Sequence, residues 1–376
     1  MAEAESIQRL YGVPHSLYTG VARCYLRTQG IPYEELPTAH PDFQERILPV
    51  TRRSIIPVLE TPEGDVIQDS LDIIDHFEAR GVPYSAYPDS ALQRVLAIII
   101  QYYGSQSMLK HAMHYRWTYR TQQEEFLRDA FAAGAGEELA DRIMSRMNSY
   151  LPRLGVTEHT VAEIEASYFQ LLDTLNVHFR KHPYLFGGRP SVGDYGLIGP
   201  LFAHLGRDPV PCDIMKVRAP RVYRWVERMT APGLDTPEFQ GYGSEFLPGD
   251  EIPETLVPLL EQIADEIFPE LTDKFVFLDD LIETHRPEDG QPVSDKPHQR
   301  YVGLVDTQFR GMPMQSGVEP YLVYILRRAD QVLASVSQTE QQAVRAFLET
   351  YRLADALPGN RGYSVDRRNQ IEVWER

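Results

Sequence analysis

Cysteine is almost absent from this sequence. Only Cys24 and Cys212 occur among 376 residues, which is too few for the disulfide framework of a small secreted protein. We therefore expect a reducing, cytoplasmic environment. The chain also has no apolar run of about 18 residues, so we expect no membrane-spanning helix. The first residues, MAEAESIQRLYG, do not combine a basic region with an apolar one, so we expect no signal peptide.

Basic residues are also in short supply. The chain has 37 Lys and Arg residues against 54 Asp and Glu residues, which gives a formal net charge of −17. A charge of this sign argues against binding along the phosphate backbone of a nucleic acid. It does not prevent a locally basic pocket from binding a small anion. The hydrophobic content of 43% is ordinary for a globular protein, and the length predicts two or three domains.

The first 84 residues alternate between strand and helix patterns. Strands are expected over 7–13 and 31–37, with a helix over 21–30 between them that ends at Gly30. The segment IIPVLETPEGDVIQ predicts a hairpin around PEG, and a helix over 70–81 follows it. This order predicts a mixed sheet of about four strands covered by helices. Pro57 is unusual here, because a central strand does not tolerate proline.

The pattern changes to helices after residue 84. We expect an all-helical domain over 90–232, with Ser90 as one helix cap and Ser191–Asp194 as an S-x-x-D capping box. The remaining residues, 233–376, show no repeat. They predict a mainly helical region with amphipathic helices over 251–285, 319–336 and 339–357, and with extended segments over 299–311 and 362–376.

Two segments of the chain resemble a known family. The segment IIPVLETPEGDVIQDS in the strand-rich part, followed by YLFGGRPSVGDYGLIGPLFAHL in the helical part, is similar to the glutathione transferases. The resemblance covers residues 6–232 and implies an α/β plus all-α architecture. Residues 1–84 would be a thioredoxin-like domain that binds glutathione, and 90–232 the all-helical domain of the family. Residues 233–376 would be a long C-terminal extension of unknown role.

The resemblance also implies a binding site for glutathione. In the family the proline that corresponds to Pro57 is cis, so the main chain of Ile56 would pair with the cysteinyl part of the tripeptide. Asp69 would bind the γ-glutamyl ammonium, Ser70 at a helix start would bind the γ-glutamyl carboxylate, and Arg53 would meet the glycyl carboxylate. The residues alone also allow a trans proline at a sheet edge, an ordinary helix cap and an exposed arginine pair.

The catalytic group implied by the resemblance is a hydroxyl near the start of the first helix. The family lowers the pKa of the glutathione thiol by aiming a hydroxyl and a helix N-terminus at the sulfur. Ser16 falls at the position of the catalytic serine in serine-type members, and Tyr18 is the second choice. Because no cysteine occupies this position, conjugation or thiolytic cleavage of an ether or halide is favoured over thiol–disulfide exchange.

The second substrate would lie against the first helix of the helical domain. Tyr103, Ser107, His111 and Tyr115 share one face of that helix by their spacing, and an aromatic face with a few polar groups suits an apolar electrophile. The same spacing also suits packing in a helical core. We expect no metal site, no nucleic-acid partner and no membrane contact. The family implies a homodimer, and a non-catalytic protein that binds glutathione or another ligand is the alternative function.

Overall fold

The computed structural model describes residues 7–233 and 236–376. Its N-terminal part is built around a four-stranded sheet with the order β2-β1-β3-β4. Strand β2 runs parallel to β1, and β3 runs antiparallel to both of its neighbours, β1 and β4. This is the mixed sheet expected from the sequence, in a thioredoxin-like unit. Its elements are β1 (Gln8–Tyr11), α1 (Leu17–Thr28), β2 (Tyr33–Leu36), α2 (Leu48–Thr51), β3 (Val58–Glu60), β4 (Val66–Gln68) and α3 (Ser70–Glu78).

The second part is all helical, as expected, but the long first helix is interrupted. A π-helical turn, Tyr103–Ser107, separates α4 (Ala91–Tyr102) from α5 (Leu109–Thr118). Ser191 and Asp194 form the predicted capping box at the start of α9. Gly136, with a φ of +87°, lies between two of the helices that follow. The remaining helices are α6 (Arg120–Ala135), α7 (Glu137–Asn148), α8 (Val161–His178), α9 (Val192–Ala203), α10 (Pro209–Arg218) and α11 (Pro220–Thr230).

The C-terminal region contains the three predicted helices and two small hairpins. The first predicted extended segment forms β5, but its partner strand β6 was not predicted from the sequence. The second extended segment folds back on itself as β7 and β8, which we call the C-terminal hairpin. The elements are α12 (Val257–His285), β5 (Gly303–Phe309), β6 (Met312–Val318), α13 (Tyr321–Ser335), α14 (Gln338–Thr350), β7 (Ser364–Arg368) and β8 (Ile371–Glu375).

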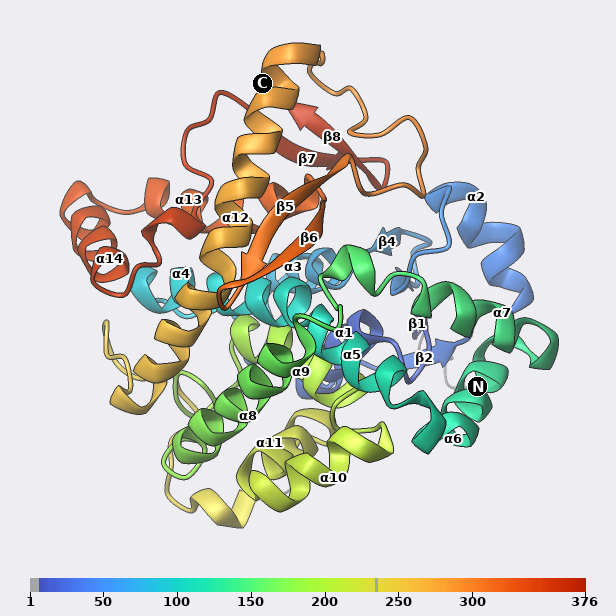
Figure 1. The fold of residues 1–376 in the computed structure, drawn as a ribbon. Helices are drawn as coiled ribbons and strands as arrows, with labels where there is room; N and C mark the ends of the chain where they lie inside the picture. The colour runs from blue at the N-terminus through green and yellow to red at the C-terminus, as the bar shows by residue number, and fades with distance from the viewer. Residues whose placement is uncertain (1–6, 234–235) are drawn as a thin grey trace.

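The C-terminal region packs against both preceding parts. Figure 1 shows its hairpins and α12 in the upper part of the view and α13 and α14 at the left, with α10 and α11 at the bottom. One continuous apolar core includes Leu71 of α3, Ile99 of α4, Leu260 of α12, Ile325 of α13 and Trp374 of β8. The extension is therefore part of the folded body. The domain limits of 84, 90 and 232 stay a prediction.

Candidate active site

The bond between Ile56 and Pro57 is cis, as the resemblance implies. The proline directly precedes β3, which lies inside the sheet, so the alternative of a trans proline on an edge strand is wrong. The neighbouring main chain is paired, because Ile55 O accepts a hydrogen bond from Gln68 Nε2 at 2.7 Å and Pro57 O accepts one from Asp69 N at 3.2 Å. In the described ranges, the N–H and carbonyl of Ile56 itself make no hydrogen bond. An extended ligand could therefore pair with Ile56.

Ser16 begins helix α1 next to this main chain. It is the N-cap, with extended backbone angles, and its Oγ accepts a hydrogen bond from Thr19 N at 3.3 Å. This bond uses the oxygen and leaves the hydroxyl proton free to donate. Tyr18, one residue inside the helix, is different. Its hydroxyl already donates to the carbonyl of Ser105 at 3.1 Å, and burial raises its pKa well above the usual value for a tyrosine.

Ser16 and Ile56 line the same cavity, which has a volume of about 320 Å³. We call it the Ser16 cavity. One wall comes from the loop before α1 and from the segment before β3, and the other comes from α5, α6 and α7. The helical wall is mainly apolar. It consists of Leu109, Met113, Trp117, Phe131, Ile143 and Met147, together with the Arg116 side chain.

The ionisable groups of the Ser16 cavity are neutral or already paired. Arg116 binds both carboxylate oxygens of Asp208, at 2.7 and 2.9 Å. Burial, with help from Arg116, lowers the pKa of His15 to about 3, and burial likewise lowers the pKa of His204 well below its usual value. Among the described residues, the Nδ1 atoms of His15 and His204 have no hydrogen-bond partner. An imidazole with so low a pKa is too weak a base to take a proton from a thiol at neutral pH.

Arg53, expected to bind the glycyl carboxylate, is already bound by the C-terminal hairpin. Its Nη1 and Nη2 donate to the two carboxylate oxygens of Glu372, at 2.6 and 3.1 Å. Its Nε donates to Gln68 Oε1 at 2.7 Å, and Nη2 also donates to the carbonyl of Gln370 at 2.6 Å. The Arg53 and Glu372 side chains are only 2% and 5% exposed, so the alternative of an exposed arginine pair is wrong for Arg53.

Glu372 lies among several cations. Burial alone would raise its pKa, but Arg300, Arg53 and Arg367 outweigh that effect and lower the pKa to about 2. Glu372 is therefore ionised at neutral pH, and a carboxylate of the chain itself is bound where the resemblance implied a carboxylate of the ligand.

Asp69, expected to bind the γ-glutamyl ammonium, is also contacted by the extension. Its Oδ2 accepts a hydrogen bond from the hydroxyl of Tyr321 at 2.6 Å, and its Oδ1 caps α3 through Leu71 N at 2.9 Å. Arg367 lies 4.0 Å from Asp69 and 2.6 Å from Asp72. Ser70 is buried at the start of α3. Arg53, Gln68 and Asp69, which we call the polar patch, thus lie under residues that follow position 320.

The residues expected to bind the electrophile lie away from the Ser16 cavity, whose lining includes none of them. The Tyr103 hydroxyl donates to Glu266 of α12 at 2.8 Å, and His111 Nε2 contacts Ser167 Oγ of α8 at 2.8 Å. Tyr115 is buried against Tyr168. This face of the π-helical turn and α5 therefore packs in the molecular interior, which was the alternative that the spacing left open.

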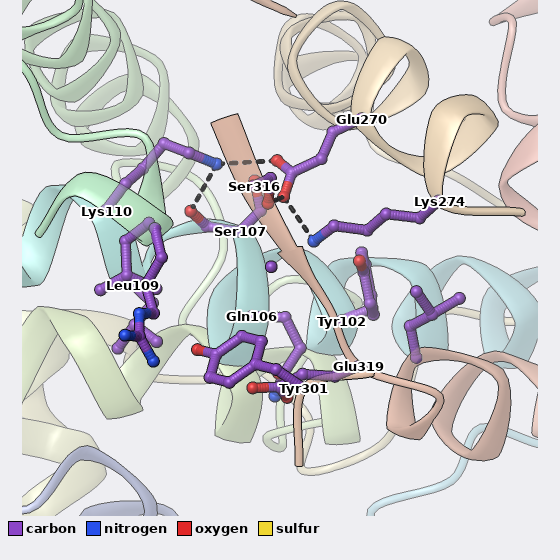
Figure 2. A pocket seen from close by; sticks show the side chains of 14 residues that line it. Tyr102, Gln106, Ser107, Leu109, Lys110, Glu270, Lys274, Tyr301, Ser316 and Glu319 are labelled. Carbon is purple, nitrogen blue, oxygen red and sulfur yellow. Dashed lines mark hydrogen bonds and ion pairs between the residues drawn. The ribbon is translucent and has the colours of Figure 1, made fainter. Parts of the chain in front are cut away.

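Ser107 lines a different, smaller cavity of about 50 Å³ between α5 and the extension (Figure 2). Glu270 occupies its upper wall and accepts hydrogen bonds from Lys110 at 3.1 Å, Lys274 at 2.6 Å and Ser316 at 2.6 Å. Burial opposes ionisation of Glu270, but the two ammonium groups outweigh it and hold the pKa well below its usual range. The contacts of Glu270 around this cavity therefore connect the helical domain to the extension.

Sequence reasoning missed the residues that actually form the helical wall. Leu109, Met113, Arg116 and Trp117 follow a helical spacing, on a different face of the helix from the predicted set. This row of residues was visible in the sequence. However, the π-helical turn before α5 changes the orientation of α5 relative to α4. The polar-patch partners Tyr321, Arg367 and Glu372 had no local signal, because they lie about 250 to 320 residues further along the chain.

The described residues contain no group of three or more His, Cys, Asp and Glu side chains that could hold a metal ion. His111 and His114 form an H-x-x-H pair in the sequence, and His114 contacts Glu165 Oε1 at 3.0 Å and Thr118 Oγ1 at 2.9 Å. Within residues 7–233 and 236–376, no helix has both the length and the apolar character needed to cross a bilayer.

Comparisons with known proteins agree with the two-domain interpretation. The family profile for the glutathione S-transferase N-terminal domain matches residues 10–83, and that for the C-terminal domain matches residues 158–228. A search of curated proteins found no match.

Among solved structures, a glutathione S-transferase from Xanthobacter autotrophicus Py2 is 18% identical. The alignment covers 67% of this chain and 99% of that one, with a TM-score of 0.36. A beta-etherase from Sphingobium sp. strain SYK-6 is 16% identical, over 62% of this chain and 98% of that one, with a TM-score of 0.45. A transferase from Ceriporiopsis subvermispora in complex with glutathione is 17% identical, over 59% and 96% of the two chains, with a TM-score of 0.40. Both domain profiles match in the expected order, so residues 10–83 and 158–228 are similar to the two domains of the glutathione S-transferases.

Proposed function

We propose that this protein is a glutathione transferase-like enzyme that activates the thiol of glutathione for attack on a small apolar electrophile. One observation carries the proposal. The hydroxyl of Ser16 and the unpaired main chain of Ile56 border the same cavity, and the opposite wall of that cavity is apolar. A cysteinyl residue paired with Ile56 would have its sulfur near Ser16, and the electrophile would bind against Met113 and Trp117.

Ser16 would act by stabilising the thiolate. A free thiol has a pKa of about 8.5, so only a few per cent is ionised at pH 7. The Ser16 hydroxyl can donate to the sulfur because its oxygen, not its proton, is used by Thr19 N. The N-terminus of α1 adds a favourable dipole. Since His15 and His204 are poor bases, the thiol proton passes to solvent.

The bond-forming step then needs no other cofactor. The thiolate sulfur donates an electron pair to an electrophilic carbon and forms a sulfur–carbon bond. A halide or an ether oxygen leaves with the electron pair of the broken bond, and an oxygen leaving group takes up a proton from solvent. In an addition, the π electrons of a double bond move to the far atom, which is then protonated. Both outcomes yield a thioether of glutathione.

Two further parts of the proposal concern assembly and location. We propose a homodimer because the family implies one. Helix α13 covers one face of α4, so a partner subunit would have to use another surface. Sedimentation velocity tests the dimer. We place the protein in the cytoplasm because its two cysteines are unpaired and Cys24 is buried in α1.

A second candidate function is a non-catalytic protein that binds an apolar ligand. The observation that favours it is the polar patch, where Arg53 and Asp69 already have partners from the chain itself. Such a protein would use the Ser16 cavity without activating a thiol.

The two functions are separated by the ultraviolet difference spectrum of bound thiolate. We expect a thiolate band when glutathione is added to the wild-type protein, and we expect Ser16→Ala to abolish it. Ser149→Ala is the matched control, because that exposed serine lies after α7, outside the cavity lining. Absence of a thiolate band in the wild-type protein, whether or not glutathione is retained, would favour the binding protein. A band that survives in Ser16→Ala would rule out Ser16 as the activating group.

A further inference from the structure

The extension contacts the two ends of the predicted tripeptide site and leaves its middle open. At one end Glu372 neutralises Arg53, and at the other end Tyr321 and Arg367 face Asp69. Between them the main chain of Ile56 is unpaired and borders the Ser16 cavity. The three positions differ in chemistry, because the ends are charged and the middle is apolar.

At the Arg53 end, the guanidinium of Arg53 is already largely used. Four of its five N–H groups donate to Glu372, Gln68 or the carbonyl of Gln370, which leaves one N–H on Nη1. A ligand carboxylate would also lie beside the ionised Glu372, and like charges in a buried site repel strongly. A glycyl carboxylate would therefore have to displace Glu372.

At the Asp69 end, an ammonium group meets the opposite problem. Both carboxylate oxygens already accept hydrogen bonds, one from Tyr321 and one from Leu71 N. The guanidinium of Arg367, which is paired with Asp72, lies 4.0 Å away and would repel a second cation. A γ-glutamyl ammonium would therefore have to share Asp69 with Tyr321 and Leu71 N and lie beside the cation of Arg367, or displace Tyr321.

The C-terminal hairpin that holds these contacts is firmly docked. Val365 and Trp374 are 0% and 2% exposed and belong to the main core. The side chain of Gln370 pairs with the edge strand β4, because it accepts from Gln68 N at 3.1 Å and donates to Val66 O at 2.8 Å. Undocking would expose this apolar surface and leave the outer edge of β4 unpaired. The hairpin is thus a fixed part of the site.

We propose that Glu372 and Tyr321 determine which thiol the site accepts. They occupy the places of the two charged ends of glutathione, so a thiol with a cysteinyl main chain and no charged ends gains relative to the tripeptide. This inference rests on the proposed function, because it assumes that the thiol lies between Ser16 and Ile56. The favoured co-substrate class is a small uncharged thiol, with glutathione as a weaker competitor.

The test compares two thiols on the full-length protein. Glutathione and N-acetylcysteine methylamide are titrated by isothermal calorimetry into the wild type, Glu372→Gln, Tyr321→Phe and the control Glu375→Gln. Glu375 lies in the same hairpin but pairs with Arg327. We expect the wild type to bind the uncharged thiol at least as tightly as glutathione. In Glu372→Gln and Tyr321→Phe, the ratio should shift toward glutathione by about tenfold, while Glu375→Gln keeps the wild-type ratio.

Two other results would overturn the inference in different ways. A wild type that prefers glutathione about tenfold, with the same ratio in Glu372→Gln and Tyr321→Phe, would overturn it and leave the proposed function standing. Binding of neither thiol by any of the four proteins would overturn the proposed function and the inference with it. If Glu372→Gln does not fold, Tyr321→Phe decides, because that change removes a single hydroxyl.

Discussion

The Ser16 cavity and the polar patch lie side by side on the thioredoxin-like unit, yet they have opposite character. The cavity is open and mainly apolar, and Ile56 in its wall has free main-chain groups. In the polar patch Arg53 and Asp69 are contacted by residues from the extension. The comparison shows that the two charged side chains expected to bind a ligand are contacted by a later part of the same chain, while the neighbouring main chain stays free.

The largest expected effect comes from removing the Glu372 carboxylate, which binds Arg53 of the polar patch. Glu372→Leu leaves Arg53, Arg300 and Arg367 without their shared carboxylate in a buried place. Removing one partner of a buried ion pair costs about 3–5 kcal/mol. We expect a loss of this size in the free energy of unfolding, measured by urea denaturation with near-ultraviolet circular dichroism.

The matched control for this loss is in the same strand. The side chain of Glu375 is 45% exposed and pairs with Arg327 at 3.0 Å. Glu375→Leu should cost no more than about 1 kcal/mol, as is typical of surface ion pairs. Equal losses in the two variants would mean that the polar patch does not hold the hairpin in place.

The second effect is the pH dependence of the stability that ionised Glu372 provides through its contacts with arginines. The pKa of Glu372 is about 2 in the folded protein, against 4.5 for an unperturbed glutamate. A folded pKa below the unfolded one stabilises the protein above pH 4.5, and this stability is lost as the pH falls from 4.5 toward 2. The contribution is at most about 3 kcal/mol.

This pH effect is measured as a difference between two proteins. The free energy of unfolding of the wild type should fall more steeply than that of Glu372→Gln as the solution is acidified below about pH 4.5, because only the wild type can protonate residue 372. If the free energies of unfolding of the two proteins fell equally steeply with pH, the pKa of Glu372 would be the same in the folded and unfolded states.

The Ser16 cavity is tested as an apolar binding site by filling it with a larger side chain. Met147 lines the Ser16 cavity from the end of α7 and is partly exposed, so a larger side chain there can be accommodated at the rim. Met147→Trp should weaken binding of an apolar fluorescent dye by about tenfold, equal to 1.4 kcal/mol.

The control for the narrowed cavity is a tryptophan placed elsewhere on the same helix. Leu139 is exposed and does not line the cavity, so Leu139→Trp should leave dye binding unchanged. Weaker binding in both variants would indicate a dye site other than the Ser16 cavity.

Local signals in the sequence predicted most of the framework. The hairpin around PEG, the capping box at Ser191 and the helix that starts at Ser70 depend on neighbouring residues, and the structure contains all three. The helices of the extension followed from their amphipathic spacing for the same reason. Strand β6 was missed because Met312–Val318 has a proline, a glycine and little alternation of apolar residues.

The contacts of the site could not be predicted in the same way. Arg53 was interpreted from its distance to Pro57, but its partner Glu372 lies 319 residues away. The face of α5 was interpreted as if α4 and α5 were one straight helix, and the π-helical turn at Tyr103–Ser107 removes that regularity. Which groups remain free for a ligand depends on the tertiary fold, and residue spacing does not record it.

The smallest expected effect separates the two candidate hydroxyls. Tyr18→Phe removes only the hydrogen bond to the Ser105 carbonyl, which contributes about 0.5–1.5 kcal/mol to stability. Because that hydroxyl is already donating and Ser16 is not, the thiolate band of the glutathione complex should persist in Tyr18→Phe and disappear in Ser16→Ala. Both variants are measured by the ultraviolet difference spectrum at equal saturation with glutathione. Loss of the band in Tyr18→Phe alone would transfer the activating role to Tyr18, and would require its hydroxyl to leave Ser105 when the thiol binds.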